Sequence, residues 1–268
     1  MATIFTLLSV VPFWDESMDV TRFYAAGWGN AVYWGKHVMY MDIDEAHGGS
    51  MNMWDASGAT WGAMGGFRRN QWGVEFSYEQ VSLRYWHNDD DVVTDRSTKT
   101  VFDLAIKRFF NASTHTYVGF DIRSQKFTGQ TIATQQTYYN INNEVNGTCF
   151  ALSGKYFLEN DRFNRPNRGL LPWVGGDFGF YSSSYSDDND VASDALTPEI
   201  GLNIGLMVKP WSWLDFWGMG GVSLLESQYD IGDNTNADPR YEYVRHSNTL
   251  GYFRLGMTLT YTRGYVLE

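Results

Sequence analysis

The chain has 268 residues, enough for one large domain, and carries a formal net charge of −11. This charge excludes nucleic acid as a main partner, because binding phosphates requires clustered Lys and Arg. The single cysteine, Cys149, excludes an internal disulfide framework and a metal site built from several cysteines. No run approaches the roughly 18 consecutive apolar residues that a transmembrane helix needs.

Segments that alternate between apolar and polar residues recur along the chain, with polar, turn-rich stretches between them. The first part predicts strands over Thr3–Phe13, Val20–Trp28 and Ala31–Ile43, with Gly29-Asn30 as a tight turn between the last two. The later strands are predicted at Gly58–Phe67, Trp72–Trp86, Thr100–Phe110, Thr116–Thr128, Gly147–Leu158, Leu171–Tyr185, Thr197–Val208, Leu214–Tyr229 and Thr249–Thr262. Several reach the roughly 9–11 residues that a tilted membrane-spanning strand requires.

The connections between these strands alternate in length and charge. Arg68–Gln71 and Asn111–Thr114 are short, whereas His87–Thr98, Gly129–Asn146 and Asp230–Asn248 are long and acidic. Short turns on one side and long loops on the other are typical of outer-membrane barrels.

The strand count follows from this alternation. Twelve strands bring both ends of the chain to the short-turn side, and we favour this number because TIFTLLSVVPFW is too apolar to stay in water. If the first 20 residues are instead a plug or a loose tail, the count is ten. Since no linker divides the sequence, residues 1–268 are expected to form a single domain.

The two faces of each strand differ in chemistry. Ile200, Leu202 and Ile204 share one face of a strand, and Glu199 and Asn203 share the other. A soluble β-protein with one solvated face also alternates, and would turn the apolar face inward. The opposite orientation is favoured because the polar faces are rich in small residues suited to a crowded interior and aromatic residues cluster at strand ends, as at membrane interfaces.

The whole chain therefore resembles the bacterial outer-membrane β-barrels. The resemblance implies an all-β transmembrane antiparallel up-and-down barrel in the outer membrane of a Gram-negative bacterium, with short periplasmic turns and long acidic extracellular loops. It also implies contact with membrane lipid and lipopolysaccharide.

The inward face is the predicted functional surface. Charged rings of this kind set solute selectivity in pores, and twelve strands leave room for a narrow pore where eight are just filled by side chains. We expect a monomeric porin-like channel for small polar or charged solutes; a barrel enzyme acting on lipid or peptide and an adhesin or structural barrel are the alternatives. The expected pore-lining residues are Asp103, Lys107, Asp121, Arg123, Asp177, Glu199 and Arg254.

Two stretches suggest catalysis. His246-Ser247-Asn248 is similar to the His-x-Ser-Asn signature of outer-membrane lipid hydrolases, in which the His activates the Ser. Here His246 and Ser247 are adjacent, so a regular strand points them to opposite faces. Asp42-x-Asp44 with His47 resembles half of the site of the outer-membrane aspartyl-type proteases, but the expected second loop, Ser186–Asp194, has no His.

The acidic loops are weak candidates for divalent ions. Their carboxylates are hard oxygen ligands of the kind that Ca²⁺ prefers, which could also bridge to lipopolysaccharide. The spacing is not that of an EF-hand, and an ordinary solvated surface is the alternative. The candidate ligands are Asp89, Asp91, Asp188 and Asp190, and no other cofactor is expected.

Overall fold

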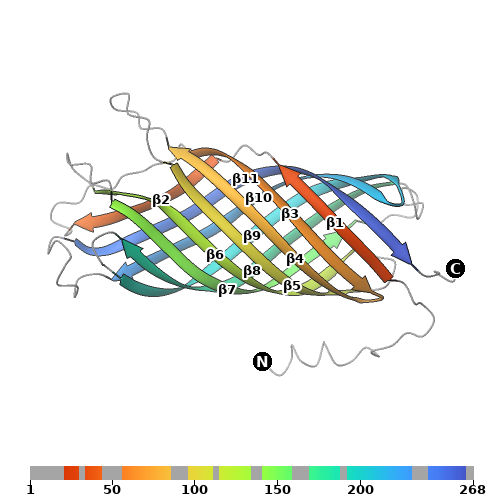
Figure 1. Ribbon diagram of the computed structural model, residues 1–268, viewed down its shortest axis with the longest axis horizontal. Helices are drawn as coiled ribbons and strands as arrows, with labels where there is room; N and C mark the ends of the chain where they lie inside the picture. The colour runs from red at the N-terminus through yellow and green to blue at the C-terminus, as the bar shows by residue number, and fades with distance from the viewer. Residues whose placement is uncertain are drawn as a thin grey trace, which may run out of the picture.

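The computed structural model describes residues 21–29, 34–43, 56–85, 96–110, 115–133, 141–158, 169–187, 192–230 and 241–263. Almost all of them lie in strands that wind around a common axis (Figure 1). The strands are β1 (Thr21–Gly29), β2 (Trp34–Ile43), β3 (Ala56–Arg69), β4 (Trp72–Tyr85), β5 (Arg96–Phe109), β6 (Tyr117–Ala133), β7 (Ile141–Phe157), β8 (Gly169–Asp187), β9 (Ala192–Trp211), β10 (Leu214–Asp230) and β11 (Tyr241–Arg263). Across these ranges there is no helix long and apolar enough to cross a membrane.

The sheet closes on itself. From β3 to β11 every strand pairs antiparallel with the next one in the chain, and β1 pairs with both β3 and β11. A closed ring leaves no continuous unpaired edge, so its backbone polar groups are satisfied without water, as a membrane interior requires.

The ring has ten strand positions, because β1 and β2 share one of them. Gly29 at the end of β1 pairs with Leu255 of β11, and Trp34 at the start of β2 pairs with Gly251 farther along the same strand. The two strands therefore lie end to end and do not form the predicted hairpin at Gly29-Asn30. The twelve-strand prediction is wrong and the ten-strand alternative is confirmed, while the predicted strand Thr3–Phe13 lies outside the described residues.

The strands extend farther toward the long-loop end than the alternation predicts. Tyr241–Asn248, predicted as loop, belongs to β11 and is paired with β10 residue by residue. Similarly, β6 continues to Ala133 and β9 begins at Ala192. A strand gains its backbone hydrogen bonds whether or not its outer face meets lipid, so pairing can continue past the residues that alternate between apolar and polar.

The short turns and both ends of the described chain lie together at the other end of the barrel (Figure 1). The turn from β3 to β4 consists of two residues, Asn70 and Gln71, and Asn70 has a φ of 51°. Asn tolerates this left-handed conformation better than most residues, which suits it to a two-residue hairpin turn.

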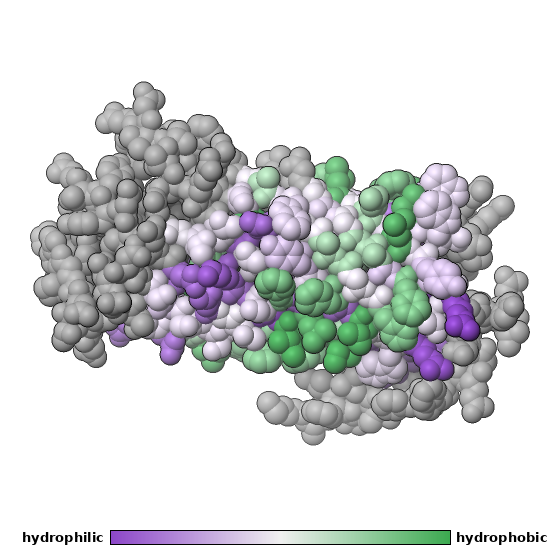
Figure 2. All heavy atoms as spheres, viewed as in Figure 1, coloured by the Kyte–Doolittle hydropathy of each residue, from purple (hydrophilic) through white to green (hydrophobic). Residues whose placement is uncertain are grey.

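The outer wall is apolar, as the alternation predicts. Leu202 and Ile204 on β9 are 59% and 66% exposed, and outward Phe, Leu, Ile and Val side chains recur on the other strands. Figure 2 shows the apolar residues gathered over the middle of the wall. Such a surface fits lipid, so the barrel spans a membrane.

Inward-facing glycines make room for aromatic side chains. In four cross-strand pairs, an aromatic ring from one strand covers the glycine directly opposite, so that a Cβ there would stand within 2.1–2.3 Å of ring atoms. These pairs are Tyr24–Gly66, Trp28–Gly62, Trp173–Gly205 and Trp217–Gly256. The wall is thus lined by rings that lie along it.

Candidate functional site

All seven predicted lumen residues lie inside the barrel. Lys107, Asp121 and Glu199 are buried, with no more than 6% of each residue exposed, because they face inward from the wall. The other four are partly buried on β5, β6, β8 and β11. This inward orientation follows from the period of two along each strand, and a role in lining a pore stays a prediction.

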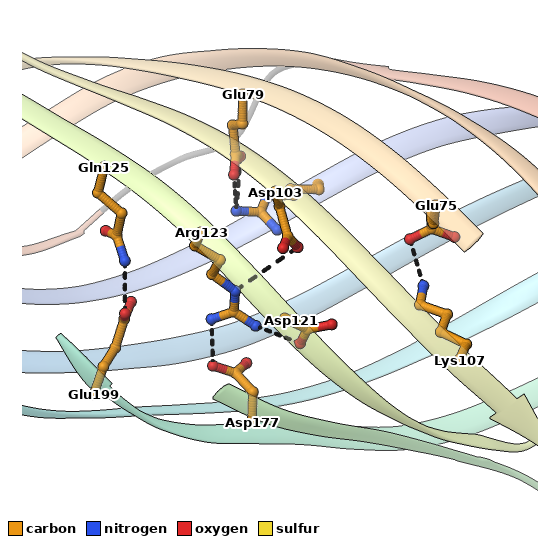
Figure 3. Close-up of polar contacts among 10 residues, drawn as sticks. Glu75, Glu79, Asp103, Lys107, Asp121, Arg123, Gln125, Asp177 and Glu199 are labelled. Atoms are coloured by element: carbon orange, nitrogen blue, oxygen red, sulfur yellow. Dashed lines mark hydrogen bonds and ion pairs between the residues drawn. The ribbon is translucent and has the colours of Figure 1, made fainter. Parts of the chain in front are cut away.

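Arg123 is the centre of the largest charged cluster. Its guanidinium lies 2.6 Å from Asp177 Oδ2, 3.1 Å from Asp121 Oδ2 and 3.7 Å from Asp103 Oδ2. The three carboxylates come from β5, β6 and β8, and Figure 3 shows them grouped around the one cation. Arg can hold several carboxylates at once because its planar head carries five donors.

Two further charged pairs involve β4. Lys107 Nζ donates to Glu75 Oε1, and Tyr24 donates to the other oxygen of Glu75 over 3.2 Å. Arg254 Nη2 lies 2.7 Å from Glu79 Oε1, which joins β11 to β4 across the interior. Glu79 was missed as a site residue, although its odd-numbered position on β4 matches that of Glu75.

Gln125 and Glu199 form a neutral-to-charged contact farther toward the loops. Gln125 Nε2 donates to Glu199 Oε2 over 2.6 Å, and both side chains are buried (Figure 3). Paired in this way, these inward charges meet the requirement that buried charges be paired or hydrated.

A cavity of about 1270 Å³ occupies the interior from the short-turn end to the middle of the barrel. Ser212 and Trp213, in the turn between β9 and β10, line one end, and Gln125 and Glu199 line the other. The cavity therefore opens at the short-turn end, and its wall carries both signs of charge.

Beyond this cavity, toward the loops, the interior is filled by an aromatic layer. We define the layer as Phe127, Tyr181, Tyr185, Tyr229 and His246, all of which are 0% exposed. The rings of Phe127 and His246 meet with centroids 4.4 Å apart. Met39 of β2 pairs with His246 of β11 on one side and with Thr131 of β6 on the other, so β2 brings these two strands together at this level.

Sequence reasoning did not identify the aromatic layer. Its signal was present in the period of two, because Phe127 follows Arg123 and Gln125 on the same face of β6. The contact with His246 carries no such signal, because it depends on the pairing of β2 with both β6 and β11.

The weak catalytic pair lies on a regular part of β11. His246 pairs with Ser227 and Ser247 with Glu226, with no irregularity in the register between them. His246 packs into the aromatic layer. A catalytic role for this pair stays an untested prediction.

The metal candidates Asp89, Asp91, Asp188 and Asp190 lie outside the described residues, as do Asp44 and His47 of the protease-like stretch. Within the part of the chain that the structure covers, no group of three or more His, Cys, Asp or Glu side chains is arranged to hold a metal ion.

A scan against protein families finds no match, and no curated protein matches the chain. Among solved structures, it is similar to the outer membrane protease OmpT from Escherichia coli, with 11% identity and a TM-score of 0.47, over 94% of this chain and 99% of that one. The translocator domain of the autotransporter NalP from Neisseria meningitidis has 10% identity and a TM-score of 0.43, over 96% and 92%. Ail, the attachment invasion locus protein of Yersinia pestis, has 11% identity and a TM-score of 0.24, over 91% and 100%.

The architecture of the chain itself defines its class. It is a closed antiparallel ring with an even number of strand positions, an apolar outer wall, and short turns gathered with both described ends at one end. These are the features of bacterial outer-membrane β-barrels, and they place the chain in the outer membrane.

Proposed function

We propose that the barrel is a narrow outer-membrane channel for small polar or charged solutes, closed at rest by the aromatic layer. The observation that carries the proposal is the charged cavity of about 1270 Å³, which opens at the short-turn end and stops below Phe127 and His246. A barrel serving only as a structural anchor has no need for a polar cavity of this size in its interior.

The aromatic layer is suited to act as a gate. Apolar constrictions close channels by excluding water rather than by filling every gap, so a small separation of facing rings restores conduction. The contact between Phe127 and His246, with ring centroids 4.4 Å apart, is closer than the Phe127–Tyr181 and Tyr185–Tyr229 contacts of the same layer. Separating these two rings would join the cavity to the space on the loop side.

Planar-bilayer recording tests this proposal. The wild-type barrel should give small or brief currents, and Phe127→Ala should give larger and longer ones, because the substitution removes one of the two rings in contact. Phe120→Ala is the matched control: it removes a Phe from the same strand, but from the lipid-facing wall, where Phe120 is 43% exposed.

The proposal predicts an increase in conductance for Phe127→Ala and none for Phe120→Ala. All three proteins should first show the gel migration of a folded barrel, so that lost current is not mistaken for lost structure. Folded wild-type and Phe127→Ala proteins that both pass no measurable current would overturn the channel function.

A further inference from the structure

The short-turn end of the cavity carries a concentration of positive charge. Arg22, Arg68, Lys155 and Lys209 line the cavity there together with His115. They come from β1, β3, β7 and β9, so the cations surround the opening rather than follow one strand. We refer to these five residues as the basic mouth.

Contacts with the wall hold the cations of the basic mouth in place. Arg68 Nε donates to the carbonyl oxygen of Asn70 over 2.8 Å, and its guanidinium lies 3.7 Å from the centre of the Phe109 ring. Lys155 Nζ lies 4.9 Å from the ring centre of Trp173. Side chains fixed in this way lose little further entropy when a ligand binds.

His115 shows how closely the cations converge. Its Nε2 lies 2.7 Å from Lys209 Nζ, and because an ammonium group only donates, Nε2 must accept and the ring must be neutral. Burial and the positive charges of Lys209, Arg22, Arg68 and Lys155 hold the pKa of His115 well below its usual range. Four cations therefore act on one half-buried side chain.

One carboxylate lines the cavity beside these cations in the described part of the chain. Asp215 Oδ1 lies 3.9 Å from Lys209 Nζ, whereas Glu75, the next carboxylate inward, accepts a hydrogen bond from Lys107. Farther inward the charge balance reverses: the cations there are Lys99, Lys107, Arg123 and Arg254, and the more numerous carboxylates are Glu75, Glu79, Asp103, Asp121, Asp177 and Glu199. The lumen is thus positive at its opening and acidic at its middle.

We infer that the basic mouth is a binding site for a small oxyanion with the chemistry of a phosphate group. Four cations from four strands, held around one opening, match the several acceptor oxygens of such an anion, and charge-assisted hydrogen bonds to those oxygens are strong. The acidic middle of the lumen opposes deeper entry, so the anion is held at the opening. The inference does not depend on whether the channel conducts.

Calorimetric titration with inorganic phosphate tests the site. The wild-type barrel, refolded in a detergent without phosphate groups, should bind phosphate saturably, and chloride at equal ionic strength should not reproduce the binding heat. Arg22→Gln and Lys209→Gln should each weaken binding about tenfold or more, because each removes a charge-assisted hydrogen bond. Lys126→Gln, which removes a cation paired with Glu144 and 51% exposed, should leave the affinity unchanged.

Asp215→Asn gives a test of opposite sign. It removes the carboxylate beside Lys209 without removing a cation, so phosphate should bind more tightly, which no general loss of structure would produce. A wild-type barrel without saturable phosphate binding, or an Asp215→Asn variant that binds no better, would overturn the inference.

The phosphate group could belong to a free anion or to a lipid headgroup. Repeating the titration in bilayers of phosphatidylglycerol and of phosphatidylcholine separates the two sources. Equal affinity in both bilayers assigns the site to a free anion, and weaker binding in phosphatidylglycerol alone assigns it to an anionic headgroup that competes for the mouth.

Discussion

Replacing Arg123 by Met should strongly destabilise the barrel. The substitution keeps an unbranched side chain of similar reach but removes the cation that lies within 4.0 Å of Asp103, Asp121 and Asp177. Removing one partner of a buried ion pair costs about 3–5 kcal/mol, because the remaining charge stays buried without compensation. Here three carboxylates are left facing one another, so we expect a loss within that range or above it.

Urea unfolding of the lipid-reconstituted barrel at pH 8, followed by tryptophan fluorescence, measures this loss. Lys126→Met is the matched control on the same strand, since its pair with Glu144 is largely exposed and pairs of this kind contribute about 0–1 kcal/mol. A double-mutant cycle of Arg123→Met with Asp177→Asn should give a coupling energy of at least about 1 kcal/mol, because the Arg123 and Asp177 side chains are in contact. If Arg123→Met and Lys126→Met lower the free energy of unfolding by amounts that agree within about 1 kcal/mol, the assignment of Arg123 as the centre of the cluster is refuted.

Three further outcomes are expected. The pKa of His115 in the barrel lies below its ordinary 6.5, so the unfolded chain takes up the proton first as the pH falls. The free energy of unfolding should therefore decrease as the pH drops below about 6.5. His115→Gln should flatten this pH dependence between about pH 8 and about pH 5. Leu202→Arg, on the lipid-facing wall, should lower the free energy of unfolding from vesicles in urea by about 2–4 kcal/mol if the residue lies near the bilayer midplane. A decrease near zero would contradict the orientation of β9. Gly205→Val should cost about 1–3 kcal/mol because its side chain meets the Trp173 ring, whereas Gly154→Val, whose nearest neighbour is 3.7 Å away, should be tolerated in the same assay.

The period of two predicted much of the wall. Trp72–Trp86 and Leu214–Tyr229 differ from β4 and β10 by a single residue at one end. The same period turned Asp121 and Arg123 inward, because adjacent strand residues must face opposite sides of a sheet. Local rules of this kind need no knowledge of the neighbouring strand.

The contacts across the lumen could not be predicted in this way. Arg254 and Glu79 are 175 residues apart in the chain, and they meet because the closed ring staggers each strand against the next. Phe127 and His246 are also far apart in the chain, and their strands approach because β2 pairs with both β11 and β6. The end-to-end arrangement of β1 and β2 also escaped prediction, because two strands separated by Gly29-Asn30 have the local pattern of a hairpin.

Gel migration after detergent refolding tests most directly whether this chain is a closed barrel with a lipid-facing wall. The account predicts that an unboiled sample migrates differently from a boiled one, because the closed ring of hydrogen bonds survives the gel detergent until it is heated. It also predicts that the folded protein precipitates when detergent is withdrawn, since side chains such as Leu202 and Ile204 would then face water. A folded monomer that stays in solution without detergent would contradict the account.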